Sequence, residues 1–243
     1  MKNILFTLYS ILIFSITAHS ADWSTWGGDA TRNMVSLETD LDLDFNPGEM
    51  NDDETVDMST TQNVKWVAKL GSQAYGNVTI GNGRVFAGTN NESPRDEGKK
   101  GDRGVVMCFD EKSGELDWQL VIPKLGAGKV SDWEYIGVCS SPAIEGDRVY
   151  VVTNKCEVVC LDIAGFSNGN DGPFMDEASY VKPKGTQDLL NEKLDADILW
   201  IYDMRDQLGV FPHNVTSSSP LIIGDNIFVA TSNGVDWSHT NIP

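Results

Sequence analysis

The sequence predicts an all-β fold built from a repeated antiparallel unit. A pair of strands joined by a tight turn occurs three times, with the second strand of the pair at residues 84–89, 148–153 and 226–231. Each copy ends in a threonine, at positions 89, 153 and 231, and a glycine-containing turn precedes each copy. Such self-similarity indicates a repeat architecture, in which one unit cannot bury its apolar face without a neighbour.

Each complete copy contains four predicted strands. We expect them at residues 77–80, 84–89, 104–109 and 115–121 in the first copy, and at 141–145, 148–153, 157–161 and 198–203 in the second. Four antiparallel strands joined as a meander are typical of a β-propeller blade. We therefore expect a partial propeller of about three four-stranded blades, at about 77–121, 141–203 and 219–243, which does not close into a ring. Residues 63–70 read as one strand of a closing blade.

The first 62 residues are expected to lie outside the propeller. Lys2, the apolar run at residues 4–16 and the small residues before Ala21 indicate a signal peptide at 1–20, too short for a membrane span. Residues 21–62 are predicted to be extended or irregular. The formal charge of −18 and the pI of about 4.3 argue against nucleic acid as a partner. We therefore expect a periplasmic or secreted protein.

Several segments resemble the pyrroloquinoline-quinone-like (PQQ-like) propeller repeat family of exported bacterial proteins. They are Gly-Asp-Arg-Val-Tyr-Val-Val-Thr at 146–153, Val-Val-Cys-Leu-Asp at 158–162, Leu-Trp at 199–200 and the turn at 110–118. The opening at 23–29, Trp-Ser-Thr-Trp-Gly-Gly-Asp, also resembles the start of mature members. Members close a ring of about seven or eight blades. The resemblance therefore implies an N-terminal fragment whose partners include the missing blades of the same polypeptide.

Three tryptophans are expected to be structural. Trp66, Trp118 and Trp200 end the outermost strands, where an indole can wedge between neighbouring blades and donate its N–H to backbone. Cys139 and Cys156 are predicted to reach the same end of the second blade, where a disulfide can form in an oxidising compartment, although two free thiols remain the alternative.

One loop is rich in potential calcium ligands. Asp162, Asn168, Asn170 and Asp171 offer oxygen atoms of the kind that Ca²⁺ accepts. The spacing does not match an EF-hand, and Asx turns explain Asn and Asp beside glycine equally well. The inserted residues 164–197 around this loop are polar, and we expect them to form a partly ordered flap.

Aromatic residues gather in the loops expected on the opposite face. This candidate ligand face contains Trp133, Tyr135, Phe211, His213 and Trp237. Aromatic rings beside polar groups suit a sugar, a peptide or a flat cofactor. The alternative is that these rings pack the loops onto the rim.

Two functions are consistent with this sequence, and a third is weaker. The repeat pattern without a recognisable catalytic pattern favours a non-catalytic binding or scaffold module for a protein, small-molecule or glycan ligand. The resemblance also allows a quinoprotein dehydrogenase that oxidises an alcohol or sugar with PQQ and Ca²⁺. A module that binds polysaccharide is the third possibility.

Overall fold

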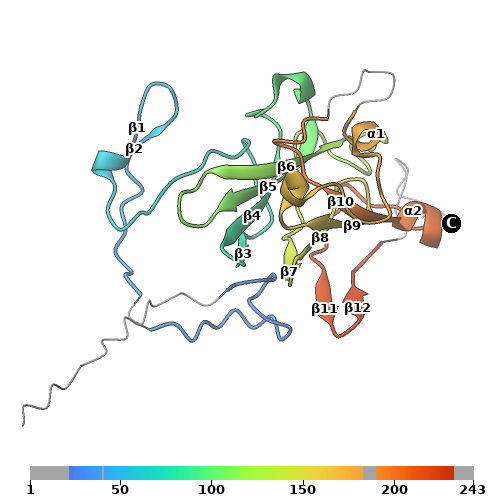
Figure 1. Cartoon of the computed structure of the whole chain (residues 1–243), viewed down its shortest axis with the longest axis horizontal. Coiled ribbons are helices and arrows are strands. Elements are labelled where there is room, and N and C mark those ends of the chain that lie inside the picture. The colour runs from blue at the N-terminus through green and yellow to red at the C-terminus, as the bar shows by residue number, and fades with distance from the viewer. Residues whose placement is uncertain (1–21, 40, 183–189, 233–243) are drawn as a thin grey trace, which may run out of the picture.

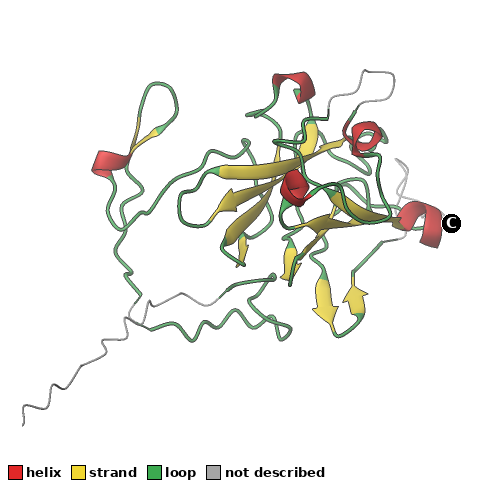
Figure 2. Cartoon of the chain, in the orientation of Figure 1, coloured by secondary structure: helices red, strands yellow, loops and turns green. Residues whose placement is uncertain are grey.

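The structure is a computed structural model that describes residues 22–39, 41–182 and 190–232. Its strands are β1 (Glu49–Met50), β2 (Val56–Asp57), β3 (Thr79–Gly81), β4 (Arg84–Asn90), β5 (Arg103–Asp110), β6 (Leu116–Pro123), β7 (Ala143–Glu145), β8 (Arg148–Val152), β9 (Glu157–Asp162), β10 (Ile198–Asp203), β11 (Leu221–Ile223) and β12 (Asn226–Phe228). The helices are η1 (Met58–Thr60), η2 (Glu97–Lys99), η3 (Gly165–Asn168), α1 (Glu177–Val181) and α2 (Met204–Leu208). All are short; η1 lies beside β1 and β2, and the others lie around the larger sheets (Figure 2). The predicted all-β, unclosed fold is confirmed. The predicted signal peptide lies outside the described residues.

Two four-stranded antiparallel sheets form the body of the molecule (Figure 1). Their orders are β3-β4-β5-β6 and β7-β8-β9-β10, each a simple meander. The register repeats from sheet to sheet: Phe86 lies opposite Cys108, which lies opposite Trp118, and Tyr150, Cys160 and Trp200 are paired in the same way. The two sheets are therefore two copies of one propeller blade.

The third copy is represented by its inner hairpin. Leu221 of β11 pairs with Phe228 of β12, as Thr79 pairs with Phe86 in the first blade. The strand predicted at 226–231 ends at Phe228, and residues 233–243 of the predicted third blade lie outside the described residues.

The expected strand at 63–70 is not formed, because no described strand pairs with this segment and a strand requires a hydrogen-bonded neighbour. Trp66, Ala68 and Leu70 still cover an apolar flank of the first blade, which consists of Val85, Val105, Met107, Phe109 and Val121. Residues 63–70 thus pack against the first blade through their side chains, without forming the backbone hydrogen bonds of a strand with any described residue.

The main core lies between the two complete blades. Side chains alternate along each strand, so that Val106 and Cys108 of β5 face the second blade while Val105 and Met107 face the other flank. From the second blade, β8 and β9 contribute Val149, Val151, Val159 and Leu161 to the same core. Each blade therefore buries its apolar flank only against a neighbouring element.

Trp66 and Trp118 make the same contact at successive blade junctions. Trp66 Nε1 donates to the carbonyl of Glu111 at 2.9 Å, and Trp118 Nε1 donates to the carbonyl of Ile163 at 3.0 Å. In both cases the acceptor lies 45 residues further along the chain. Each indole thus binds the turn between the third and fourth strands of the blade that follows it in the chain.

A glycine lies under each of these two indoles. Gly114 and Gly165 have φ of +74° and +56°, and a Cβ atom on them would lie 2.5 and 2.8 Å from the rings of Trp66 and Trp118. Only glycine allows both this backbone and this approach. Trp200 holds the equivalent place in the second blade, half-buried, with its ring 6.0 Å from that of Tyr150.

The N-terminal segment is more ordered than the sequence indicates. The carbonyl of Trp23 accepts the N–H of Ile80 in β3, and that of Ser24 accepts the N–H of Ile144 in β7. Arg32 donates to the carbonyl of Ser219, just before β11. Residues 22–32 thus run along the inner strands of all three blades, whereas the hairpin β1–β2 projects away from the sheets (Figure 1).

The insertion at 164–197 is not a flap over the described part of its length. Tyr180 and Val181 of α1 are buried in the main core, and Phe174 packs against it. The Tyr180 hydroxyl donates to Glu157 at 2.7 Å. Tyr180 and Val181 thus fix the described part of the insertion between the two blades. The polar composition of the segment did not reveal this packing.

Candidate functional site

An aromatic cavity of about 580 Å³ lies where the inner strands of the three blades begin. Gly76, Ser141 and Ser219, which shortly precede β3, β7 and β11, all line it. The other lining residues are Trp26, Arg32, Tyr75, Trp133, Ile136, Cys139, Val215, Ser217, Ser218 and Ala230. No carboxylate and no histidine is among these described residues. The wall therefore offers apolar rings, hydroxyl groups and a guanidinium.

Arg32 brings positive charge to this cavity from the N-terminal segment. Its guanidinium carbon lies 5.4 Å from the centre of the Trp26 ring, and one terminal nitrogen donates to Ser219 at 3.0 Å. Its Nε is buried and has no partner among the described residues. An N–H group without a partner is costly to bury. The Nε–H of Arg32 can therefore donate a hydrogen bond to an acceptor on a ligand.

Trp133 is held by its backbone and exposes its ring. Its N–H donates to the carbonyl of Asn214 at 2.8 Å, and its own carbonyl accepts from Lys124 Nζ at 2.7 Å. The residue is 43% exposed, and Lys129 lies over the ring at 5.7 Å. A rigidly placed, exposed indole is a typical anchor for a binding partner.

The other residues of the predicted ligand face are not all brought to this cavity. Tyr135 is exposed next to Trp133 but does not line the cavity. His213 lines an adjoining cavity of about 290 Å³, which shares with the aromatic cavity the wall at Val215, Ser217, Ser218 and Ala230. Phe211 accepts from Ser232 through its carbonyl. Trp237 lies outside the described residues. The predicted face therefore contributes Trp133, whereas the sequence did not reveal Trp26, Arg32 and Tyr75.

The predicted disulfide between Cys139 and Cys156 is wrong, because all four cysteines are free and buried. Cys139 lines the aromatic cavity and lies beside Gly76 of the first blade, whereas Cys156 packs with Val158 and Met204 on the other flank of the second blade. The two residues share an end of the blade but not a side. Burial raises the pKa of the Cys139 thiol to about 11, so it is protonated at neutral pH and is not a nucleophile.

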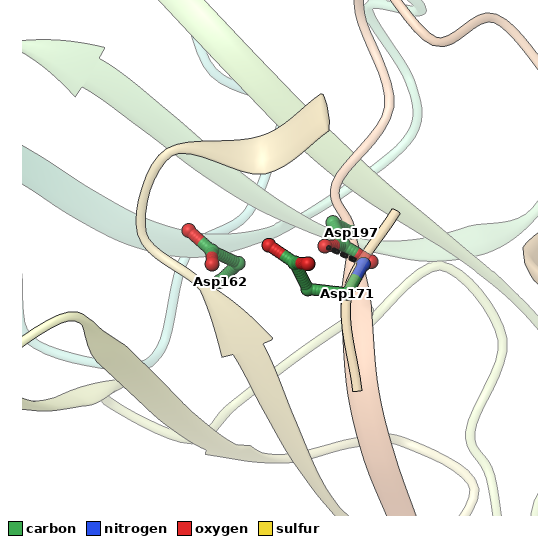
Figure 3. A group of neighbouring side chains, drawn as sticks. All are labelled: Asp162, Asp171 and Asp197. Carbon is green, nitrogen blue, oxygen red and sulfur yellow. Dashed lines mark hydrogen bonds between the residues drawn. The ribbon is translucent and has the colours of Figure 1, made fainter. Parts of the chain in front are cut away.

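A group of carboxylates lies at the other end of the second blade. Asp162 ends β9, Asp171 follows η3, and Asp197 precedes β10; one carboxylate oxygen of each lies within 4.8 Å of the others (Figure 3). We call these three residues the acidic cluster. Asp162 and Asp197 are buried, whereas Asp171 is exposed. The cluster borders a cavity of about 400 Å³ that is also lined by Asn168, Arg148 and Trp200.

The hydrogen bonds of the acidic cluster come from the loop itself. Asp162 accepts from the N–H of Ala164 at 2.7 Å, and Asn168 Nδ2 donates to both Asp162 and Asp171 at 3.2 Å. Asp197 accepts the N–H of Asp171 at 2.9 Å through Oδ2. Burial raises the pKa of Asp197 to about 6, and the charges of Glu177, Asp162 and Asp171 add to that rise.

The sequence anticipated part of this cluster. It singled out Asp162, Asn168, Asn170 and Asp171, and the structure places Asp162, Asn168 and Asp171 together. Asn170 instead donates to Glu177 at 3.0 Å. The sequence did not reveal Asp197, although a signal existed: an antiparallel pair places the residue before β10 beside the residue that ends β9.

Comparison with known proteins identifies the family. The family described as outer membrane protein assembly factor BamB, a PQQ-like repeat family, matches residues 52–166 and again residues 102–236. The chain belongs to this family. The two overlapping matches agree with the repeated blades described above. No curated protein matches the chain. None of the helices in the described ranges has the length and apolar character to span a bilayer.

The aromatic cavity does not fit the quinone after which the repeat is named. PQQ carries three carboxylates, and in a dehydrogenase it acts beside a Ca²⁺ ion held by protein oxygen ligands. The cavity offers one guanidinium and no carboxylate among its described lining residues. The acidic cluster lies at the opposite end of the blade, since Asp162 pairs with Arg148 beside the β7–β8 turn.

Proposed function

We propose that the chain is an exported, non-catalytic binding module that holds a segment of a partner protein at the aromatic cavity. The observation that carries this proposal is the composition of the cavity wall: aromatic rings and an arginine with an unpartnered buried Nε, without an acid–base pair among the described lining residues. Such a wall suits an apolar side chain of a partner next to a carbonyl or carboxylate that accepts from Arg32.

Family membership supports a protein as the partner. The family description names an assembly factor for outer membrane proteins, whose work is on other polypeptides. Export is supported by the charged and apolar residues at the N-terminus, which have the order of a signal peptide. The net charge of −18 favours partners that are basic overall, whereas Arg32 and Lys129 at the cavity favour a hydrogen-bond acceptor beside the apolar anchor.

Peptide selection tests this proposal. Peptides selected from a random displayed library on the immobilised full chain should bind the wild type in solution, and Trp133→Ala should weaken them at least about tenfold because it removes the exposed anchor. Fluorescence anisotropy with labelled peptides measures the affinity. Tyr202→Ala is the matched control, because Tyr202 is also an exposed aromatic, at 40%, but does not line the cavity.

Three results contradict the proposal. The first is equal binding by wild type and Trp133→Ala. The second is saturable binding on a glycan array that Trp133→Ala abolishes, which favours a polysaccharide ligand. The third is dye-linked oxidation of alcohols or sugars after addition of PQQ and Ca²⁺, which restores the quinoprotein alternative.

A further inference from the structure

Asp197 carries a buried oxygen that nothing in the described chain satisfies. The residue is 0% exposed, and its Oδ1 has no hydrogen-bond partner among the described residues. Asn170 Oδ1, in the loop that leads to Asp171, is a second buried oxygen without a partner there. Buried polar atoms are nearly always satisfied, and a bound ion is one of the usual reasons for an apparent exception. The unsatisfied oxygen of Asp197 therefore calls for a donor or a cation.

The negative charge around this oxygen is also uncompensated. Asp162, Asp171 and Asp197 lie together, and the nearby Glu177 is buried as well. None of the ion pairs in the described ranges involves any of these four carboxylates. Arg148 borders the same cavity, but its ion pair is with Asp147. Buried carboxylates are normally paired with a cation or coordinate a metal.

Turn hydrogen bonds satisfy the aspartate of the first blade, whereas in the second blade they satisfy Asp162 but leave Asp197 Oδ1 without a partner among the described residues. Asp110 corresponds to Asp162, because its N–H also donates across the turn, to Glu115 instead of Asp197. Asp110 Oδ1 accepts from the backbone N–H groups of Lys112 and Ser113 and from the Ser113 hydroxyl, a complete Asx turn. In the second blade the inserted loop replaces this short turn and adds Asp171, so that three carboxylates face one another.

We propose that the acidic cluster of Asp162, Asp171 and Asp197 binds a Ca²⁺ ion. Asp197 Oδ1 supplies the buried ligand, Asp162 and Asp171 supply two more carboxylates, and the adjoining cavity gives access to the ion and to its waters. Glu177 is not a ligand, because its two oxygens accept from the N–H of Ile198 and from Asn170. It holds Asn170, whose Oδ1 is left without a protein partner.

The ligand type and the spacing favour calcium. Carboxylate and carbonyl oxygens select Mg²⁺, Ca²⁺ or Mn²⁺ over softer metals. Calcium binds oxygen at about 2.3–2.6 Å with flexible geometry, so two oxygens on opposite sides of the ion lie about 4.6–5.2 Å apart. The cluster oxygens all lie within 4.8 Å of one another, close enough for one such ion to contact all three. Magnesium requires a shorter, strict octahedron, which a loop that includes Gly169 and Gly172 does not impose.

Isothermal titration of the full chain with CaCl₂, after removal of divalent ions, tests the site. We expect one Ca²⁺ per chain, and a rise in Tm of about 5–10 °C at about 100 times Kd, because an ion that binds only the folded state stabilises it. Asp197→Asn and Asp171→Asn should each weaken binding at least about tenfold. Asp225→Asn makes the same charge change in the exposed β11–β12 turn and should bind Ca²⁺ as the wild type does.

Asp171→Asn should fold normally even if Asp197→Asn does not, because Asp171 is exposed. The replacement also keeps the backbone N–H that donates to Asp197. The proposal is overturned if the wild type binds no Ca²⁺ at about 10 mM, roughly ten times the Kd of about 1 mM of the weakest protein sites, or if Asp171→Asn and Asp197→Asn bind like Asp225→Asn. Tighter binding of Mg²⁺ than of Ca²⁺ overturns the assignment of the metal.

Discussion

Asp195 and Asp197 lie two residues apart in the same segment before β10, and both are buried, yet their surroundings are opposite. Asp195 accepts from the ammonium group of Lys99, which is itself 0% exposed and also lies 3.1 Å from Asp96. Asp197 faces two other carboxylates and no cation among the described residues. Burial raises the pKa of both carboxyl groups, but Lys99 opposes the rise only at Asp195.

Asp195 and Asp197 therefore have different roles, although both lie in the short segment before β10. The Lys99–Asp195 pair joins η2, which lies between β4 and β5 of the first blade, to the insertion at 164–197 of the second, so the charge of Asp195 is neutralised within the protein. The acidic cluster borders a cavity and leaves its charge for a group from solution. A buried carboxylate that is paired with a buried cation has a structural role. A buried carboxylate without a cationic partner in the protein indicates a bound cation.

Loss of Lys99 should have the largest effect on stability. Lys99→Met leaves Asp195 buried without its cation, and removal of one partner from a buried pair costs about 3–5 kcal/mol. Urea denaturation measures the change in the free energy of unfolding. Lys100→Met is the control, since Lys100 is exposed and should lose less than about 0.5 kcal/mol. Equal losses in the two variants contradict the structural role of the pair.

In a buffer that chelates divalent ions, the two replacements Asp197→Asn and Asp195→Asn should change the free energy of unfolding in opposite directions. Asp197→Asn removes one of three clustered negative charges, so we expect it to raise the free energy of unfolding by about 1–2 kcal/mol. Asp195→Asn leaves Lys99 short of its main partner and should lower it by about 1–3 kcal/mol. Urea denaturation in excess EGTA measures both changes. If Asp197→Asn unfolds more easily than the wild type, the proposed difference between an uncompensated Asp197 and a paired Asp195 is wrong.

Asp171→Asn should have the smallest effect when no metal is present. Its side chain is exposed, so water screens its charge, and we expect a change in unfolding free energy within about 0.5 kcal/mol. With saturating Ca²⁺ the same variant should melt below the wild type, because it lacks one ligand. A Tm that matches the wild type in both buffers removes Asp171 from the site.

The blades could be predicted because their information is local. The turns, the alternation of apolar residues and a tryptophan in the fourth strand, Trp118 or Trp200, recur in the sequence itself. The packing of the insertion could not be predicted in this way. Tyr180 and Val181 are ordinary apolar residues in a polar segment, and only the groove between two blades gives them a place.

The candidate site was predictable only where its residues share a loop. Asp162 and Asp171 lie in one stretch, whereas Asp197 reaches them through the register of β10 against β9. The disulfide prediction failed for a related reason. Strand pairing tells which end of a blade Cys139 and Cys156 reach, but the flank depends on the turn, where Cys156 has φ of +61°. Trp26 and Arg32 come from a segment without any repeat, which nothing in the pattern connects to the blades.

A crystal structure of the full chain grown with Ca²⁺, with anomalous diffraction recorded at a wavelength where calcium scatters, tests the central claim most directly. The account predicts one anomalous peak about 2.3–2.6 Å from an oxygen of each of Asp162, Asp171 and Asp197, with Asp197 Oδ1 among them. Density without such a peak at millimolar Ca²⁺, or a lysine or arginine side chain in that space, contradicts it.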